Sequence, residues 1–179
     1  MTKRKYAFSW DLIGDLSNCR PNLGLTLRIE VYRLMQFCFR DVLEQRYGTE
    51  EVDAIFYEAG VLAGRHFFEN AVVPRPENFN ALIVKLQDLL KELGIGVLRI
   101  EASDLDTLNF TLAVSEDLDC SGLPELGYEI CIYDEGFLAG ILGAYTGRPF
   151  KVKEVDCWCT NERICRFEAR PSTLEEKSC

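Results

Sequence analysis

The architecture of this chain is clearest in the segment Glu154–Phe167, which reads EVDCWCTNERICRF. It holds three of the eight cysteines of the chain, Cys157, Cys159 and Cys165. The segment from Phe150 to Ala169 is typical of a β-hairpin, and we expect its turn at Asn161. In that hairpin Cys157 lies opposite Cys165, and paired Cβ atoms are about 4.5 to 5.5 Å apart. Two thiols at this separation suit one tetrahedral zinc ion.

Other interpretations of these cysteines stay open on spacing alone. Cys159 lies on the same strand face as Cys157 and competes with other residues as a ligand. A disulfide between Cys157 and Cys165 fits the spacing, but a reducing compartment disfavours it. The cysteines can also be small buried hydrophobic residues of a cysteine-rich core.

Glu154 and Cys131 are candidates to complete a four-ligand site. A one-residue slip near Lys153 and Glu154, a β-bulge, would place Val155 and Cys157 on the core side and turn the Glu154 carboxylate towards Cys157. Cys131 opens a predicted helix, where the positive end of the helix dipole favours a thiolate. The basic residues near enough in sequence to offset the charge of this site are Lys151, Lys153, Arg163 and Arg166.

Hydrophobic periodicity divides the rest of the chain into helices and one more hairpin. Three- and four-residue spacing predicts helices over 23–47, 49–70 and from Pro76 to Gly94, followed by a fourth over 131–145. Alternating apolar residues over 98–100 and 108–114, with a turn at 104–107, predict the first hairpin. Helices, strands, helix and strands in this order imply an α+β fold. We expect an arm over residues 1–19, one domain over 20–170 and a flexible tail over 171–179.

Two of the predicted helical segments share a glycine pattern. Residues 57–64 read YEAGVLAG and residues 133–140 read YDEGFLAG. Each places two glycines four residues apart on one helix face, so that another backbone or a flat ligand can approach closely. Close packing of helices is the simpler of these two explanations.

Composition limits the classes of function. The chain has 179 residues, 47% hydrophobic and 27% charged, as expected of one globular domain. No apolar run reaches the roughly 20 residues that cross a bilayer, and the first ten residues lack a signal peptide, so we expect a cytoplasmic protein. The net charge of -9 and the lack of a basic stripe oppose direct binding of nucleic acid. The single histidine, His66, is expected to pack or lie at the surface rather than bind metal.

The chain resembles the 4-vinyl reductase (V4R) domain family, a small-molecule-binding module related in fold to core subunits of the TRAPP vesicle-tethering complex. The likeness extends over about residues 20–170. The motifs that carry it are Arg20-Pro21-Asn22-Leu23-Gly24, the segment 57–64, Cys131 with Glu135-Gly136, and Glu154-x2-Cys157-x7-Cys165.

The resemblance implies a helical layer packed on a four-stranded antiparallel sheet, a hydrophobic cavity among the helices and a zinc-binding C-terminal hairpin. In the similar sensor domains of aromatic-responsive bacterial activators, cysteine, glutamate and two cysteines hold zinc. The residues that match them here are Cys131, Glu154, Cys157 and Cys165. The aromatic residues that could line the cavity are Phe37, Phe56, Phe67, Phe68, Phe137 and Tyr145. The family also implies a homodimer, to which the arm would contribute.

These features predict a free-standing domain that binds a hydrophobic or aromatic small molecule. It would act as a sensor or carrier through a separate signalling or enzyme partner. One alternative is an accessory protein or reductase of (bacterio)chlorophyll synthesis, although the chain shows no G-x-G-x-x-G after a strand, no phosphate loop and no common iron–sulfur spacing. We therefore do not expect catalysis. A non-catalytic structural adaptor is the other alternative.

Overall fold

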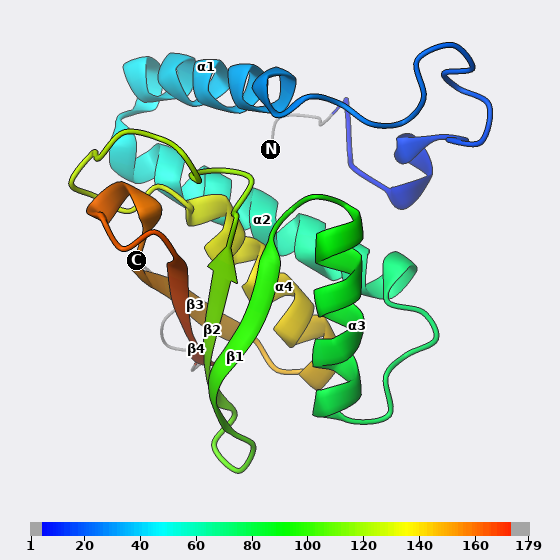
Figure 1. The fold of residues 1–179 in the computed structure, drawn as a ribbon, viewed down its shortest axis with the longest axis vertical. Coiled ribbons are helices and arrows are strands. Elements are labelled where there is room, and N and C mark those ends of the chain that lie inside the picture. The colour runs from blue at the N-terminus through cyan, green and yellow to red at the C-terminus, as the bar shows by residue number, and fades with distance from the viewer. Residues whose placement is uncertain (1–4, 173–179) are drawn as a thin grey trace.

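The structure is a computed structural model that describes residues 5–172 (Figure 1). Its helices are α1 (Ile29–Tyr47), α2 (Thr49–Ala71), α3 (Phe79–Glu92) and α4 (Ile132–Thr146), with short 3-10 helices η1 (Trp10–Ile13) and η2 (Trp158–Thr160). Its strands are β1 (Val97–Asp104), β2 (Asn109–Ser115), β3 (Phe150–Asp156) and β4 (Cys165–Pro171).

The four strands form one antiparallel sheet with the order β1-β2-β4-β3. Helix α3 packs against β1 and α4 packs against β3, so helices cover one face of the sheet. Helix α2 packs on α4, and α1 lies furthest from the sheet (Figure 1). The predicted α+β class, a helical layer on a four-stranded antiparallel sheet, is confirmed.

The shared glycine pattern builds the contact between α2 and α4. A Cβ atom on Gly60 or Gly64 would collide with the carbonyl oxygen of Tyr133 or Phe137 in α4. Gly136 and Gly140 meet α2 in the same way, at the carbonyl oxygens of Tyr57 and Val61. The two segments therefore interlock backbone against backbone, and of the two explanations close helix packing is the one the structure supports.

Helix α1 is shorter and less covered than its sequence pattern predicts. It begins at Ile29 rather than at residue 23, because Gly24 adopts a left-handed φ of 69° and Arg28 is extended. None of its side chains is buried. Leu34 and Met35 of the apolar face are 66% and 69% exposed. The amphipathic pattern is real, but the described residues do not cover its apolar side.

The β-bulge of the C-terminal hairpin lies one residue later than predicted. Pairing of β3 with β4 shifts between Glu154 and Asp156, so Val155 turns outward and is 39% exposed instead of facing the core. The Glu154 side chain faces the core without a bulge, because it lies on the same buried face of β3 as Phe150 and Val152. The bulge instead returns the chain to the core side at Cys157, which is fully buried.

The N-terminal arm is described from residue 5. The Trp10 side chain packs against the main core, and the Phe8 ring meets the His66 ring of α2 edge-on at 5.0 Å between centroids. Strand β4 extends to Pro171, while most of the predicted tail, including Cys179, lies outside the described residues. Within residues 5–172, none of the helices combines the length and apolar character of a membrane-crossing segment.

Candidate metal centre and adjoining cavity

Four cysteines that are distant in sequence meet at one end of the sheet. The sulfur atoms of Cys120, Cys131, Cys157 and Cys165 all lie within 4.8 Å of one another, and all four residues are fully buried. The Cys131 sulfur is 3.9 Å from that of Cys157 and 3.8 Å from that of Cys165. In a tetrahedral zinc site with Zn–S bonds of about 2.3 Å, sulfur atoms are about 3.8 Å apart. These four cysteines can hold a metal ion.

A different element positions each thiol. Cys131 is the N-cap of α4, Cys157 precedes the short helix η2, and Cys165 opens β4. Cys120 lies in the loop 117–121 after β2. The Asp117 carboxylate shapes that loop by accepting the backbone N–H groups of Asp119 and Cys120 at 2.9 and 3.1 Å.

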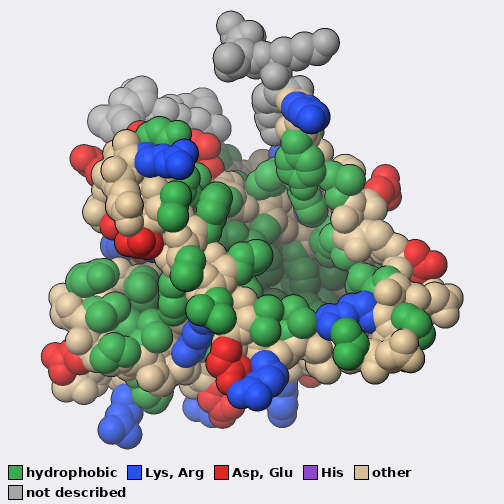
Figure 2. Space-filling model, turned by 90° about the horizontal axis from the view of Figure 1, so that it is seen from above, with side chains coloured by type: hydrophobic (Ala, Val, Ile, Leu, Met, Phe, Trp, Pro, Cys, Tyr) green, Lys and Arg blue, Asp and Glu red, His purple; other side chains and the backbone are tan. Residues whose placement is uncertain are grey.

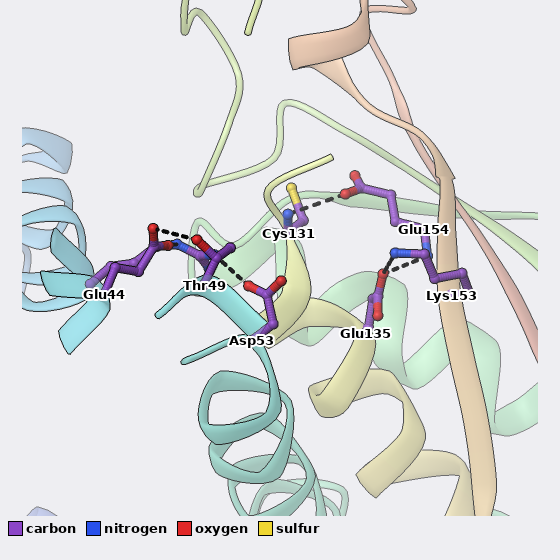
Figure 3. Close-up of polar contacts among 8 residues, drawn as sticks. Glu44, Thr49, Asp53, Cys131, Glu135, Lys153 and Glu154 are labelled. Atoms are coloured by element: carbon purple, nitrogen blue, oxygen red, sulfur yellow. Dashed lines mark hydrogen bonds and ion pairs between the residues drawn. The ribbon is translucent and has the colours of Figure 1, made fainter. Parts of the chain in front are cut away.

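Glu154 is buried beside this cluster, close enough to Cys157 and Cys165 for these side chains to influence its pKa, and it also contacts backbone. Its Oε2 atom accepts the N–H of Cys131 at 3.1 Å, at the N-terminal end of α4, where the helix dipole favours a negative group (Figure 3). Its Oε1 atom is buried with no hydrogen-bond partner among the described residues. The neighbouring Glu135 holds β3 in place by accepting the N–H of Glu154 and the Lys153 ammonium, each at 2.9 Å.

The electrostatics of the cluster favour a bound cation. Hydrogen bonds from Cys120, Cys131 and Cys165 lower the pKa of the Cys157 thiol. Burial raises the pKa of Glu154 to about 9. Burial also raises the pKa of Asp119 and Asp134. A divalent ion would supply the positive charge that lets several thiols lose their protons at once.

Two of the four basic residues expected to offset the charge of the site bind elsewhere. Lys153 pairs with Glu135, and Arg166 pairs with Glu101 and Asp156 on the strands. Both Lys151 and Arg163 are exposed.

Each predicted ligand can now be placed. Cys131, Cys157 and Cys165 come together, and Glu154 lies beside them. Cys159 is fully buried but outside the group of four sulfur atoms. Cys120 is the one cysteine of this group that was not predicted from the sequence. It lies in an irregular loop, where no helix or strand periodicity indicates which residues will be its neighbours. The only available signal was its place in the turn-forming sequence DLDC at 117–120.

An apolar cavity of about 580 Å³ adjoins the loop that carries Cys120. Met35 and Phe39 of α1, Phe56 of α2, and Tyr133 and Phe137 of α4 line it. Figure 2 shows this side of the molecule hollowed, with hydrophobic side chains inside the hollow. Volumes of about 300–1,000 Å³ are typical of sites for small molecules.

The expected aromatic lining is correct only in part. Of the six aromatic residues named from the sequence, Phe56 and Phe137 line the cavity. Phe67 and Phe68 are core residues, and Tyr145 packs on Phe68 and Phe79. In α1, Phe39 rather than Phe37 faces the cavity, because the residues that α1 contributes to the cavity wall are at positions 32, 35, 36 and 39.

Polar side chains join the cavity to the cysteine cluster. The Asp119 carboxylate accepts the Tyr32 hydroxyl at 2.7 Å and the Gln36 amide at 2.6 Å. Arg33 donates to the carbonyl oxygens of Leu118 and Ser121. Helix α1 is therefore tethered to the loop 117–121, one residue from a clustered thiol. Among the described residues, Gln36 Oε1 and Asp134 Oδ2 are buried acceptors without a partner.

Comparison with protein families gives a match over the cysteine-rich C-terminal part of the described structure. Residues 110–171, from β2 to β4, match the V4R domain. The resemblance to the V4R family is confirmed. Two uncharacterised proteins of Methanocaldococcus jannaschii are 24% and 25% identical to the chain, over 83% and 87% of its length and 80% and 84% of theirs.

Solved structures share the V4R-like fold at low sequence identity. The phenol-responsive sensory domain of the transcription activator PoxR has a TM-score of 0.64 at 16% identity, covering 86% of this chain and 78% of that one. A vinyl-4-reductase family protein of M. jannaschii has a TM-score of 0.59 at 19% identity, covering 84% and 85%. A trafficking protein particle complex subunit 3 from Naegleria fowleri has a TM-score of 0.62 at 11% identity, covering 81% and 95%.

Proposed function

We propose that this V4R-like domain binds a hydrophobic or aromatic small molecule in the cavity between α1, α2 and α4, beside a structural zinc site. The cavity is the observation that carries the proposal, because its wall is mostly apolar and the two unpartnered acceptors Gln36 Oε1 and Asp134 Oδ2 lie at it. An apolar ligand that carries one hydrogen-bond donor fits such a wall. The structural relatives support this, since one is phenol-responsive and another carries palmitic acid.

Zinc is the metal that the thiol-rich cluster suits best. Cys131, Cys157 and Cys165 are proposed as ligands, together with a fourth group at the site, for which Glu154 is the member predicted from the family. A zinc ion surrounded by four protein ligands has no open position for water, so its role would be structural. It would join the hairpin, the start of α4 and the adjoining loop.

The proposed biological role is that of a sensor or carrier in the cytoplasm that reports to, or serves, a separate protein. The wall formed by α1 supports this, because an occupied cavity would change how α1 lies on the loop 117–121. A homodimer formed through the arm and the apolar face of α1 is part of the proposal, since Val31, Leu34 and Val42, which do not line the cavity, are exposed there.

Displacement of the apolar dye Nile red tests ligand binding. Ala59 lines the cavity, so Ala59→Trp should weaken dye binding by about tenfold, because the ring occupies space where an apolar ligand is buried. Ala54→Trp is the matched control, an exposed alanine of the same helix outside this cavity. Equal binding by both variants would place the dye elsewhere and contradict the proposal.

Matched competitors test the two free acceptors. Naphthol should displace the dye about 3- to 10-fold better than methylnaphthalene, the range expected for one net hydrogen bond. Gln36→Met should reduce this preference because it removes the acceptor. Exchange of competitors also separates a sensor or carrier from a structural adaptor, whose cavity would hold a permanent occupant.

A further inference from the structure

The fourth metal ligand can be assigned from the positions of the buried side chains. We infer that Cys120, and not Glu154, completes the site with Cys131, Cys157 and Cys165. The inference rests on the proposed zinc site and makes it an all-cysteine centre. The metal would then also help to hold α1 in place, because Cys120 belongs to the loop to which α1 is tethered.

The sulfur positions are the first support. Every pair among the four sulfur atoms is within 4.8 Å, and Cys120 Sγ, at 3.1 Å from Cys165 Sγ, is closer to it than the roughly 3.8 Å expected in a tetrahedral zinc site. No carboxylate oxygen belongs to that group. Four thiolates around one ion form a common closed structural zinc site. Cys120 is fully buried, so its thiol has no access to water as an alternative partner.

The position of Glu154 is the second support. Its Oε2 atom already accepts the N–H of Cys131 at the start of α4, which is a structural task for a buried carboxylate. In this position Glu154 orients the residue that carries a ligand, and acts through that residue rather than on the metal. The free Oε1 atom keeps Glu154 as the rival that an experiment must exclude.

The loop that carries Cys120 is built to hold it in place. Asp117 fixes the backbone at Cys120 by accepting its N–H at 3.1 Å. On the other side of the loop, Asp119 binds Tyr32 and Gln36 of α1, which also line the cavity. Metal bound by Cys120 would therefore hold the α1 wall of the cavity through Asp119.

X-ray absorption at the zinc edge of the zinc-loaded full chain tests the assignment. Wild-type protein should show about four sulfur neighbours near 2.3 Å and no oxygen near 2.0 Å. Glu154→Gln should give the same spectrum, and so should Cys159→Ser, the control for a buried cysteine outside the group. Cys120→Ser should lose one sulfur neighbour. Hydrogen exchange of α1 amides should become faster in Cys120→Ser and unchanged in Cys159→Ser.

Each other outcome overturns the assignment in a distinguishable way. Three sulfur neighbours and one oxygen in the wild type, with the oxygen lost in Glu154→Gln, would assign the fourth position to Glu154 and leave the proposed zinc site intact. Wild-type protein that takes up no zinc would overturn both. The wild-type spectrum decides between Cys120 and Glu154 even where Cys120→Ser does not fold.

Discussion

Single glycines carry the contact between α2 and α4, because backbone meets backbone there. Gly60→Ala places a Cβ against the Tyr133 carbonyl oxygen, and neither backbone can move without displacing its helix. Such overpacking typically costs about 1–3 kcal/mol, and we expect the upper end of that range for the free energy of unfolding. Urea unfolding followed by circular dichroism measures it.

Gly143→Ala is the matched control in the same pair of helices. A Cβ on Gly143 would meet only the Arg148 carbonyl oxygen at 3.5 Å, an ordinary contact. Alanine should therefore leave stability unchanged or raise it by about 0.5–1 kcal/mol through its better helix propensity. Equal destabilisation by Gly60→Ala and Gly143→Ala would contradict the close-packing account.

Substitution of a clustered thiol should cost both metal and stability. Cys157→Ser is expected to lose zinc and to lower the free energy of unfolding by several kcal/mol, because metal binding and folding are coupled at structural sites. Elemental analysis and thermal unfolding measure the two effects. Cys38→Ser, at an exposed position in α1, should change neither.

Residue patterns show which parts of the site were predictable. The approach of Cys157 to Cys165 could be predicted from the hairpin register, whereas Cys131 was a candidate from its place at a helix start and joined the set through the resemblance to the V4R family. The position of Cys120 could not be predicted, because hydrogen bonds from backbone N–H groups to the Asp117 carboxylate hold its loop in place of the regular hydrogen bonds of a helix or sheet. The bulge was misplaced by one residue because Val155, as an apolar residue, was expected to face the core, whereas it is 39% exposed.

Among the elements, α1 is held by few contacts and should respond most to their loss. Tyr32→Phe removes the hydroxyl that donates to Asp119 and leaves part of a buried carboxylate unpaired, a change worth about 1–3 kcal/mol. Because no α1 side chain is buried, the loss should appear as local opening. Hydrogen exchange of α1 amides should rise while exchange in β2 and β4 stays the same.

Tyr47→Phe is the control for this prediction, since Tyr47 is exposed at the other end of α1. Protection of α1 that is identical in Tyr32→Phe and in wild-type protein would show that the Asp119 contact does not anchor the helix. The sequence predicted that α1 exists but not what covers it, because a 3.6-residue period marks an apolar face without naming its partner.

At the level of the whole molecule, the exposed apolar face of α1 and the arm predict association of two chains. Leu12 and Leu16 of the arm and Leu34 of α1 are all more than 45% exposed, at 55%, 47% and 66%. Deletion of residues 1–18 should convert a dimer to a monomer in size-exclusion chromatography with light scattering. An unchanged mass would remove the arm from the interface.

The central claim is that this domain holds one zinc ion and an apolar small molecule. Native mass spectrometry of the purified protein, beside a denatured sample and elemental analysis, tests both parts at once. The expected result is one zinc per chain, retained in the native state and lost on denaturation, together with a small organic adduct. Protein that carries neither metal nor adduct, and takes up neither when supplied with zinc and naphthol, would contradict the account.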